Sequence, residues 1–271
     1  MSNRNNKKGG NKIENILIVS HGNRMRCLLS ELYKREFKKK FKNTAIVLMK
    51  IRSNTENTTL ETSLFYDGEN SERISEKSHK YYSNENNNFE RLETTLNNKI
   101  YNGNYDIYIV RHGEGIHNLA GKFAKALNQS KYYDPKLTEE GIKQANRSGK
   151  NLIGITFDNV FISDLYRTKH TLESLNLELN MKPVVLPCAQ ELNKYTYSSY
   201  CDNSLINLIN GSENVSKCKS YVNKECKSND EKCNEIKNKC LDIADWSYYE
   251  KNKKLNCVKN NMIVQAINYK K

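Results

Sequence analysis

Short apolar runs that end in polar turns recur along the chain, and each predicts a strand. Residues 16–19 form one such run and residues 107–110 form another, as expected for strands that are buried on both faces of a parallel sheet. Shorter runs occupy residues 160–162 and 184–186. Helical patterns fall between these runs, so the order of elements predicts an α/β fold.

Apolar side chains at three- and four-residue steps predict the helices. One pattern runs from Met25 to Tyr33. Another begins after Thr138, a residue type that caps helices, and Glu139 and Glu140 suit the positive end of the helix dipole. Helices that alternate with strands cover the faces of a sheet, so we expect a three-layer α/β/α sandwich with a mostly parallel central sheet.

Two further apolar runs precede a long polar region. Residues 45–51 and 60–66 predict two strands joined by a polar turn at residues 54–58. Residues 67–104 are polar and predict a long linker, with one weak helix near residues 89–96.

Composition narrows the class of protein less than the pattern does. The chain has 271 residues, of which 37% are hydrophobic and 28% charged, and no apolar run approaches the ~18–20 residues that cross a bilayer. The basic residues 1–12 lack a following apolar stretch, so we expect no secretory signal, no membrane partner and a cytoplasmic protein. The net charge of +13 favours an anionic partner; it fits a phosphorylated substrate and leaves nucleic acid as a weaker alternative.

The eight cysteines are expected to be reduced thiols, because no leader directs the chain to an oxidising compartment. Four of them follow one another at seven- or eight-residue steps, which would place them along one helix face as small apolar residues. A zinc site and disulfides are the alternatives. These four are Cys218, Cys226, Cys233 and Cys240.

Two histidines share one sequence context. His21 and His112 each follow an apolar run and precede a glycine, and the strand ends of open α/β sheets are where ligands bind. An imidazole is a competent nucleophile near neutral pH, and Arg111, next to His112, offers a planar fork that binds phosphate. These residue types suit phosphoryl transfer.

Three motifs resemble the histidine phosphatase superfamily, in its phosphoglycerate mutase-like branch. They lie between residues 105 and 195 and are the Arg-His-Gly-Glu run starting at Arg111 with Asn118 after it, the Leu-Thr-Glu-Glu-Gly helix start at residues 137–141, and the Ser-Asp-Leu segment that precedes Arg167. Glu191 stands where the family carries an acidic proton donor.

The second His-Gly strand of the family should follow Glu191, yet no histidine occurs after His170. A matching strand, glycine and amphipathic helix occur instead at the start of the chain, around His21. The resemblance therefore implies a circular permutation of the fold; the alternative is that His21 belongs to a chance turn.

The resemblance divides the chain into five segments. The expected segments are a disordered basic tail at 1–14, the displaced C-terminal part of the phosphatase domain at 15–66, a polar linker at 67–104, the N-terminal catalytic part at 105–195, and a Cys- and Lys-rich insertion or cap at 196–271.

By resemblance, His112 is the nucleophile, His21 stabilises the transferred phosphoryl group and Glu191 donates a proton to the leaving oxygen. The predicted phosphate-binding residues are Arg111, Arg167, Asn118, Gly113 and Gly22. No metal or other cofactor is expected.

The resemblance implies a phosphomonoester hydrolase acting on a phosphorylated small molecule or protein. Two alternatives remain open. One is a phosphoglycerate mutase, although the segment at residues 190–195 lacks the longer motif that mutases of the family carry around the acid. The other is a degenerate relative that binds phosphate or a partner without catalysis.

Overall fold

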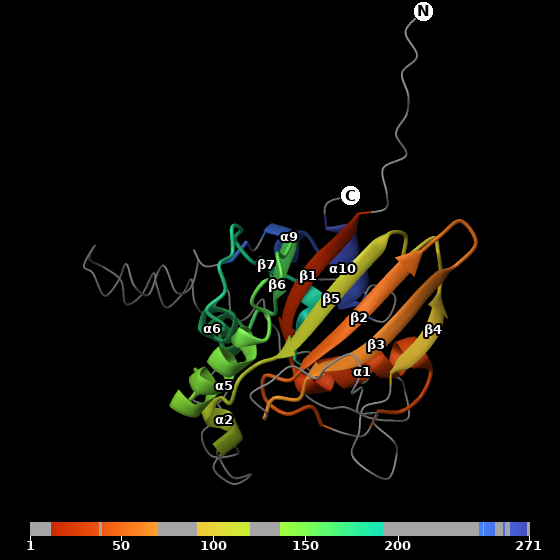
Figure 1. Ribbon diagram of the computed structural model, residues 1–271. Helices are drawn as coiled ribbons and strands as arrows, with labels where there is room; N and C mark the ends of the chain where they lie inside the picture. The colour runs from red at the N-terminus through yellow and green to blue at the C-terminus, as the bar shows by residue number, and fades with distance from the viewer. Residues whose placement is uncertain are drawn as a thin grey trace, which may run out of the picture.

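The computed structural model describes a seven-stranded sheet with helices around it (Figure 1). The described residues are 12–37, 40–69, 91–119, 136–191, 244–245, 247–252, 257 and 261–269. The predicted basic tail and the Cys- and Lys-rich segment therefore lie largely outside the described residues, as do Cys218, Cys226, Cys233 and Cys240. An α/β fold is confirmed.

The strand order is β4-β3-β2-β5-β1-β6-β7. The strands are β1 (Ile13–Ser20), β2 (Ile46–Ser53), β3 (Thr58–Tyr66), β4 (Leu92–Leu96), β5 (Asn104–Arg111), β6 (Asn159–Ile162) and β7 (Val184–Val185). The pairs β5–β1, β1–β6 and β6–β7 are parallel, whereas β2–β5, β2–β3 and β3–β4 are antiparallel. The prediction of a mostly parallel sheet therefore holds for the β5-β1-β6-β7 half alone, and the sheet as a whole is mixed. The short turn between β2 and β3 makes that pair antiparallel.

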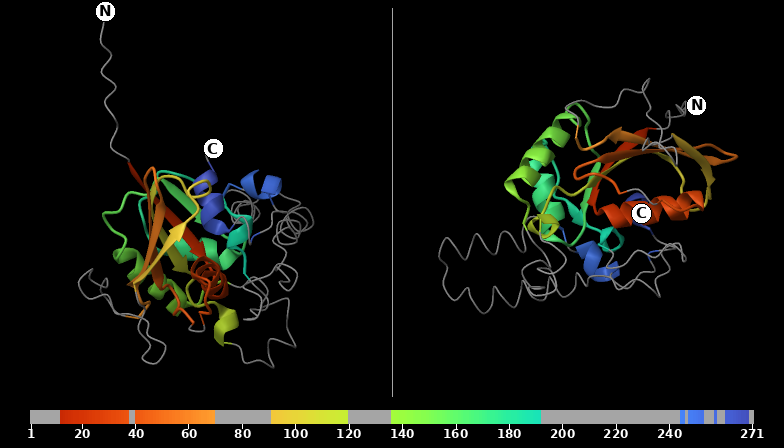
Figure 2. Two further views of the ribbon diagram at one scale, coloured as in Figure 1. Left: turned by 90° about the vertical axis from the view of Figure 1, so that its right-hand side faces the viewer. Right: turned by 90° about the horizontal axis from the view of Figure 1, so that it is seen from below.

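Helices follow the strands on both sides of the sheet (Figure 2). They are α1 (Gly22–Tyr33), α2 (Ile116–Leu119), α5 (Glu139–Lys150), α6 (Tyr166–Ser174), the 3-10 turn η2 (Pro187–Ala189), α9 (Ser247–Asn252) and α10 (Met262–Asn268). Among the described residues, no helix has both the length and the apolar character needed to cross a membrane.

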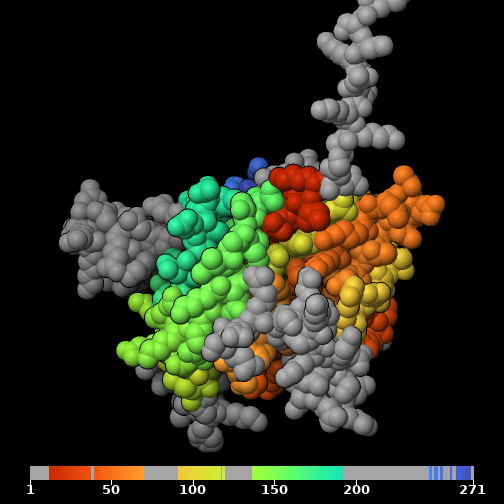
Figure 3. Space-filling view, in the orientation of Figure 1, coloured from red at the N-terminus to blue at the C-terminus, as the bar shows by residue number. Residues whose placement is uncertain are grey.

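Alternate side chains of each strand enter two separate apolar cores. Along β1, Ile16 and Ile18 pack with residues of α1 and α10, whereas Leu17 and Val19 pack with residues of α5 and α6. This alternation is the two-residue period of a strand. The outer face of α5 forms part of the molecular surface in Figure 3.

The weak helix predicted near residues 89–96 is absent, since residues 92–96 form β4 instead. β4 pairs antiparallel with β3, from Thr58 opposite Leu96 to Thr62 opposite Leu92. Its two threonines are β-branched and favour a strand. The edge of β3 provides the hydrogen-bond partners for its backbone. Local pattern could not show that pairing.

The prediction of reduced thiols was also wrong. Cys188 and Cys257 form a disulfide across 69 positions, with their Cα atoms 5.3 Å apart, and Cys27 is disulfide-bonded as well. Both Cys188 and Cys257 are buried. The pairing depends on α10 and the residues before it returning to η2, which the spacing of cysteines along the chain does not reveal.

Candidate active site

The two His-Gly pairs meet at the carboxyl ends of neighbouring strands. β1 and β5 are parallel, with Ser20 opposite Arg111, so the next residues, His21 and His112, leave the sheet side by side. Their ring centroids lie 5.1 Å apart, and the ring planes cross at 60°. Both side chains are buried, so the chain has placed two imidazoles 91 positions apart within one small space.

His112 is oriented by its own backbone. Its Nδ1 lies 2.7 Å from the carbonyl oxygen of Gly113, and a carbonyl only accepts, so Nδ1 carries the proton. The lone pair of the neutral ring is then on Nε2. Burial foremost, and then the charge of Arg167, lowers the pKa of His112 well below the ordinary value, which keeps the ring neutral and nucleophilic.

His21 is held by side chains from two other parts of the chain. Its Nε2 lies 2.8 Å from Ser163 Oγ, and its Nδ1 lies 3.2 Å from Glu191 Oε2. Burial lowers the pKa of His21 to about 4, against the opposing effect of the Glu191 carboxylate. Its backbone carbonyl accepts from Met25 N, so the residue that begins α1 is fixed by both its backbone and its ring.

Arg167 and Glu191 complete a charged cluster beside the two rings. Arg167 lies in the first turn of α6 and donates from Nη2 to Glu191 Oε2 at 3.2 Å. Its Nε is buried and has no hydrogen-bond partner among the described residues. Burial raises the pKa of Glu191, but the contact with His21 and the charge of Arg167 outweigh it and leave that pKa well below the ordinary value.

Arg111 reaches the same region from the end of β5. A Cβ built on Gly22 would lie 3.2 Å from Arg111 Nε, so the glycine leaves room for the guanidinium. Nη1 donates to the carbonyl of Phe41, while the buried Nε has no partner among the described residues. Burial lowers the pKa of Arg111 to about 10, at which the group stays cationic at neutral pH.

Gly113 has a packing role that its neighbour Gly141 shares. A Cβ at Gly113 would lie 2.6 Å from the Gly141 carbonyl oxygen, and one at Gly141 would lie 2.1 Å from that of Glu114. The Gly113 amide donates to Thr171 Oγ1 at 2.9 Å. The structure thus gives Gly113 a steric reason to lack a side chain; binding of phosphate by its backbone stays a prediction.

Asn118 lies on the short helix α2, with an exposed side chain. Its Oδ1 accepts from the Gly115 amide at 2.9 Å, which closes a local turn. Its predicted role in binding phosphate is not tested by this geometry.

Sequence reasoning placed Ser163 in a motif without a role beside His21, and it missed Arg24. Ser163 Oγ accepts from the Leu165 amide and also contacts Thr168 Oγ1, so this hydroxyl fixes the ring of His21. Arg24 is buried in the first turn of α1, and its Nε donates to the Gln190 carbonyl at 3.0 Å. Ser163 had a signal, since it ends β6 as the histidines end their strands; Arg24 had only its closeness to His21.

One metal-ligand set exists among the described residues. His21, His112 and Glu191 each offer a ligand atom, and these atoms lie within 4.8 Å of one another. The surrounding groups are cationic: Arg167 contacts the carboxylate, and Arg111 and Arg24 lie near enough to affect the pKa values of the rings. A cluster of guanidinium groups favours an oxyanion over a metal ion at this position.

Part of the chain matches the model of a known protein family. Residues 107–199 match the model of the histidine phosphatase superfamily (branch 1). That segment contains His112, Arg111, Arg167 and Glu191, while His21 lies outside it.

The chain is also similar to curated proteins named 2,3-bisphosphoglycerate-dependent phosphoglycerate mutase. It is 34% identical over 93 residues to the protein of Afipia carboxidovorans and 37% identical over 93 residues to that of Beijerinckia indica. Each match covers 34% of this chain and 42% of the relative, so the chain spans less than half the length of the relatives it matches. No solved structure is significantly similar to the chain. Together these findings support a relationship of this chain to the histidine phosphatase superfamily.

Proposed function

We propose that this protein is a phosphomonoester hydrolase that works through a phosphohistidine at His112 and needs no metal. The carrying observation is the cluster itself: two buried imidazoles 5.1 Å apart, with Arg167 and Glu191 in contact beside them. A phosphate group needs an in-line nucleophile and cations around its oxygens, and this cluster offers both.

His112 Nε2 would attack phosphorus while the bond from phosphorus to the ester oxygen breaks. Arg111, Arg167 and His21 would hold the three remaining oxygens as charge develops on them. Water would then attack phosphorus while the bond from phosphorus to His112 Nε2 breaks, which releases phosphate and returns His112 to its neutral form.

Glu191 would give its proton to the leaving oxygen and take one from the attacking water. In the free protein, His21 and Arg167 keep its pKa low, so the carboxylate is ionised. A phosphate dianion bound beside Arg167 would offset the charge of the guanidinium and raise that pKa again, so that Glu191 takes up a proton from solvent. Glu191 therefore becomes a competent acid only when substrate is present.

The circular permutation is part of the proposal. It is supported by the place of β1, which lies between β5 and β6 and pairs parallel with both. The segment that carries His21 thus forms an interior strand of the sheet, although it lies outside the matched residues 107–199.

The test is turnover without metal. The protein is incubated with p-nitrophenyl phosphate in the presence of EDTA, and rapid acid-free quenching followed by mass spectrometry locates any phosphohistidine. We expect turnover, a phosphoryl group on His112, and a loss of at least about 10³-fold in His112→Ala. Activity that survives in that variant, or that requires an added metal, would contradict the mechanism.

A mutase is the second candidate, favoured by the similarity to proteins named as phosphoglycerate mutases. The same preparation is given 3-phosphoglycerate with 2,3-bisphosphoglycerate. Formation of 2-phosphoglycerate faster than release of phosphate would favour the mutase.

A further inference from the structure

The turn that carries Glu191 is held in place by several distant parts of the chain. Ser20 Oγ donates to the Ala189 carbonyl at 2.8 Å, at the end of the strand that leads into His21. Arg24 Nε donates to the Gln190 carbonyl, one residue before the acid. These two contacts tie the turn to the segment around His21.

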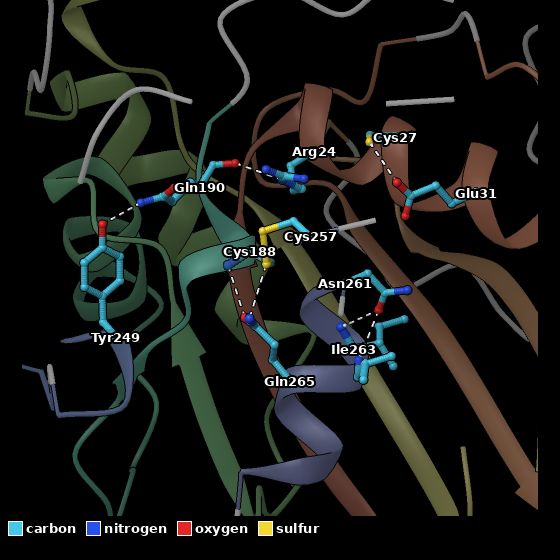
Figure 4. The surroundings of a disulfide bond; sticks show 11 residues. Arg24, Cys27, Glu31, Cys188, Gln190, Tyr249, Cys257, Asn261, Ile263 and Gln265 are labelled. Atoms are coloured by element: carbon cyan, nitrogen blue, oxygen red, sulfur yellow. Dashed lines mark hydrogen bonds between the residues drawn. A yellow bond between two sulfur atoms is a disulfide. The ribbon is translucent and has the colours of Figure 1, made fainter. Parts of the chain in front are cut away.

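The side chain of Gln190 is bound as well. Its Nε2 donates to Tyr249 OH at 2.8 Å (Figure 4). The same Nε2 donates to Asp164 Oδ2 at 3.1 Å. Gln190 is buried, so both partners lie in the protein interior. Asp164 belongs to the segment that precedes Arg167. The bond from Gln190 therefore links the turn to the segment that carries this arginine.

A covalent bond anchors the start of the turn. Cys188 lies three residues before Glu191 and is joined to Cys257, and Gln265 of α10 accepts from the Cys188 amide at 3.1 Å (Figure 4). The Gln265 Nε2 lies 3.2 Å from Cys188 Sγ. Both sulfurs are in buried residues, which shields the bond from dissolved thiols and suits a permanent anchor better than a redox switch.

We propose that the Cys188–Cys257 disulfide is a positioning element for proton transfer: it holds the turn so that the Glu191 carboxylate stays against His21 and Arg167. The proposal rests on the function proposed above. A general acid acts only within hydrogen-bond reach of the leaving oxygen, and a displacement of about 1 Å costs up to about 10²-fold in rate. The anchor acts on that distance, not on the nucleophile.

A comparison of two leaving groups distinguishes a role in positioning Glu191 from a general loss of structure. An alkyl phosphate expels a poor leaving group that needs the proton of Glu191, whereas p-nitrophenyl phosphate expels a stable phenolate that does not. We expect Cys257→Ala to lower kcat about tenfold or more on glycerol phosphate and less than about threefold on p-nitrophenyl phosphate. Glu191→Gln, the reference, has the same selectivity and a larger effect.

Two further variants sharpen the result. In the Glu191→Gln background, Cys257→Ala should cause almost no further loss on glycerol phosphate, because one function is already gone. Cys27→Ala, which removes a disulfide outside the turn, should change kcat by the same factor on both substrates. Equal losses on both esters in Cys257→Ala, or additive losses in the double variant, would overturn the proposal.

A crystal structure of Cys257→Ala gives a readout without activity. We expect the separation of Glu191 Oε2 from His21 Nδ1 to lengthen from 3.2 Å. An unmoved carboxylate would overturn the positioning role. A lack of turnover by the unaltered protein on either ester would instead count against the phosphatase, and this structural readout would still judge the anchor.

Discussion

The two strand tips of the site look alike in sequence and differ in what holds them. His112 is oriented by the carbonyl of the next residue, Gly113, so its geometry is local. His21 is oriented by Ser163 and Glu191, which come from positions 142 and 170 residues away. The orientation of the proposed nucleophile is thus set by its own turn, whereas the orientation of the ring beside it is set by the assembled sheet.

The largest effect that tests this comparison is expected from His21→Gln. The amide lacks the imidazole ring that is proposed to stabilise the transferred group, so we expect kcat to fall about 10²–10³-fold. His112 keeps its local geometry, so the phosphohistidine still forms, only slowly. Trapping of the labelled protein at fixed times measures both the rate of turnover and the formation of the phosphohistidine. Complete absence of the intermediate in this variant would contradict separate roles for the two rings.

A second expected effect concerns acid stability. Burial gives folded His21 a pKa of about 4, against an ordinary value of 6.5, so the unfolded chain binds its proton first as the pH falls. The stability due to the neutral buried ring is therefore present above pH 6.5 and lost between there and about 4, by about 3 kcal/mol in total.

Urea unfolding of the protein and of His21→Asn across this interval measures that loss. The difference between the two free energies of unfolding should change by about 2–3 kcal/mol in favour of the variant as the pH falls. Comparison with the variant cancels Glu31, whose pKa burial raises to about 8 and which acts in the opposite direction. A constant difference would show that His21 is not buried as a neutral ring.

The smallest effect is expected at Ser163. Removing its hydroxyl in Ser163→Ala takes away one hydrogen bond to His21, worth about 0.5–1.5 kcal/mol, so kcat should fall about two- to tenfold. Ser148→Ala is the matched control, because that buried hydroxyl donates to the Thr44 carbonyl and not to a histidine ring. Equal losses of kcat in the two variants would remove Ser163 from the site.

The antiparallel half of the sheet shows where local pattern was sufficient and where it was not. The β2–β3 hairpin was predicted closely, because a polar turn between two apolar runs is a local signal. β4 was not, because its short polar sequence becomes a strand only beside β3. The Thr138 cap of α5 was predicted for the same local reason as the hairpin, and Thr138 accepts from the Gly141 amide.

The sequence alone determined the strands that end in His21 and His112, the helix starts, the motifs around Arg111 and Arg167, and the resemblance that they carry. Tertiary structure alone decided that the two rings meet, that Glu191 reaches both His21 and Arg167, and that Cys188 pairs with Cys257. The physical reason is range. Periodicity, caps and turns depend on neighbours a few residues apart, whereas these contacts join residues from about 24 to 170 positions apart and exist only once β1 lies between β5 and β6.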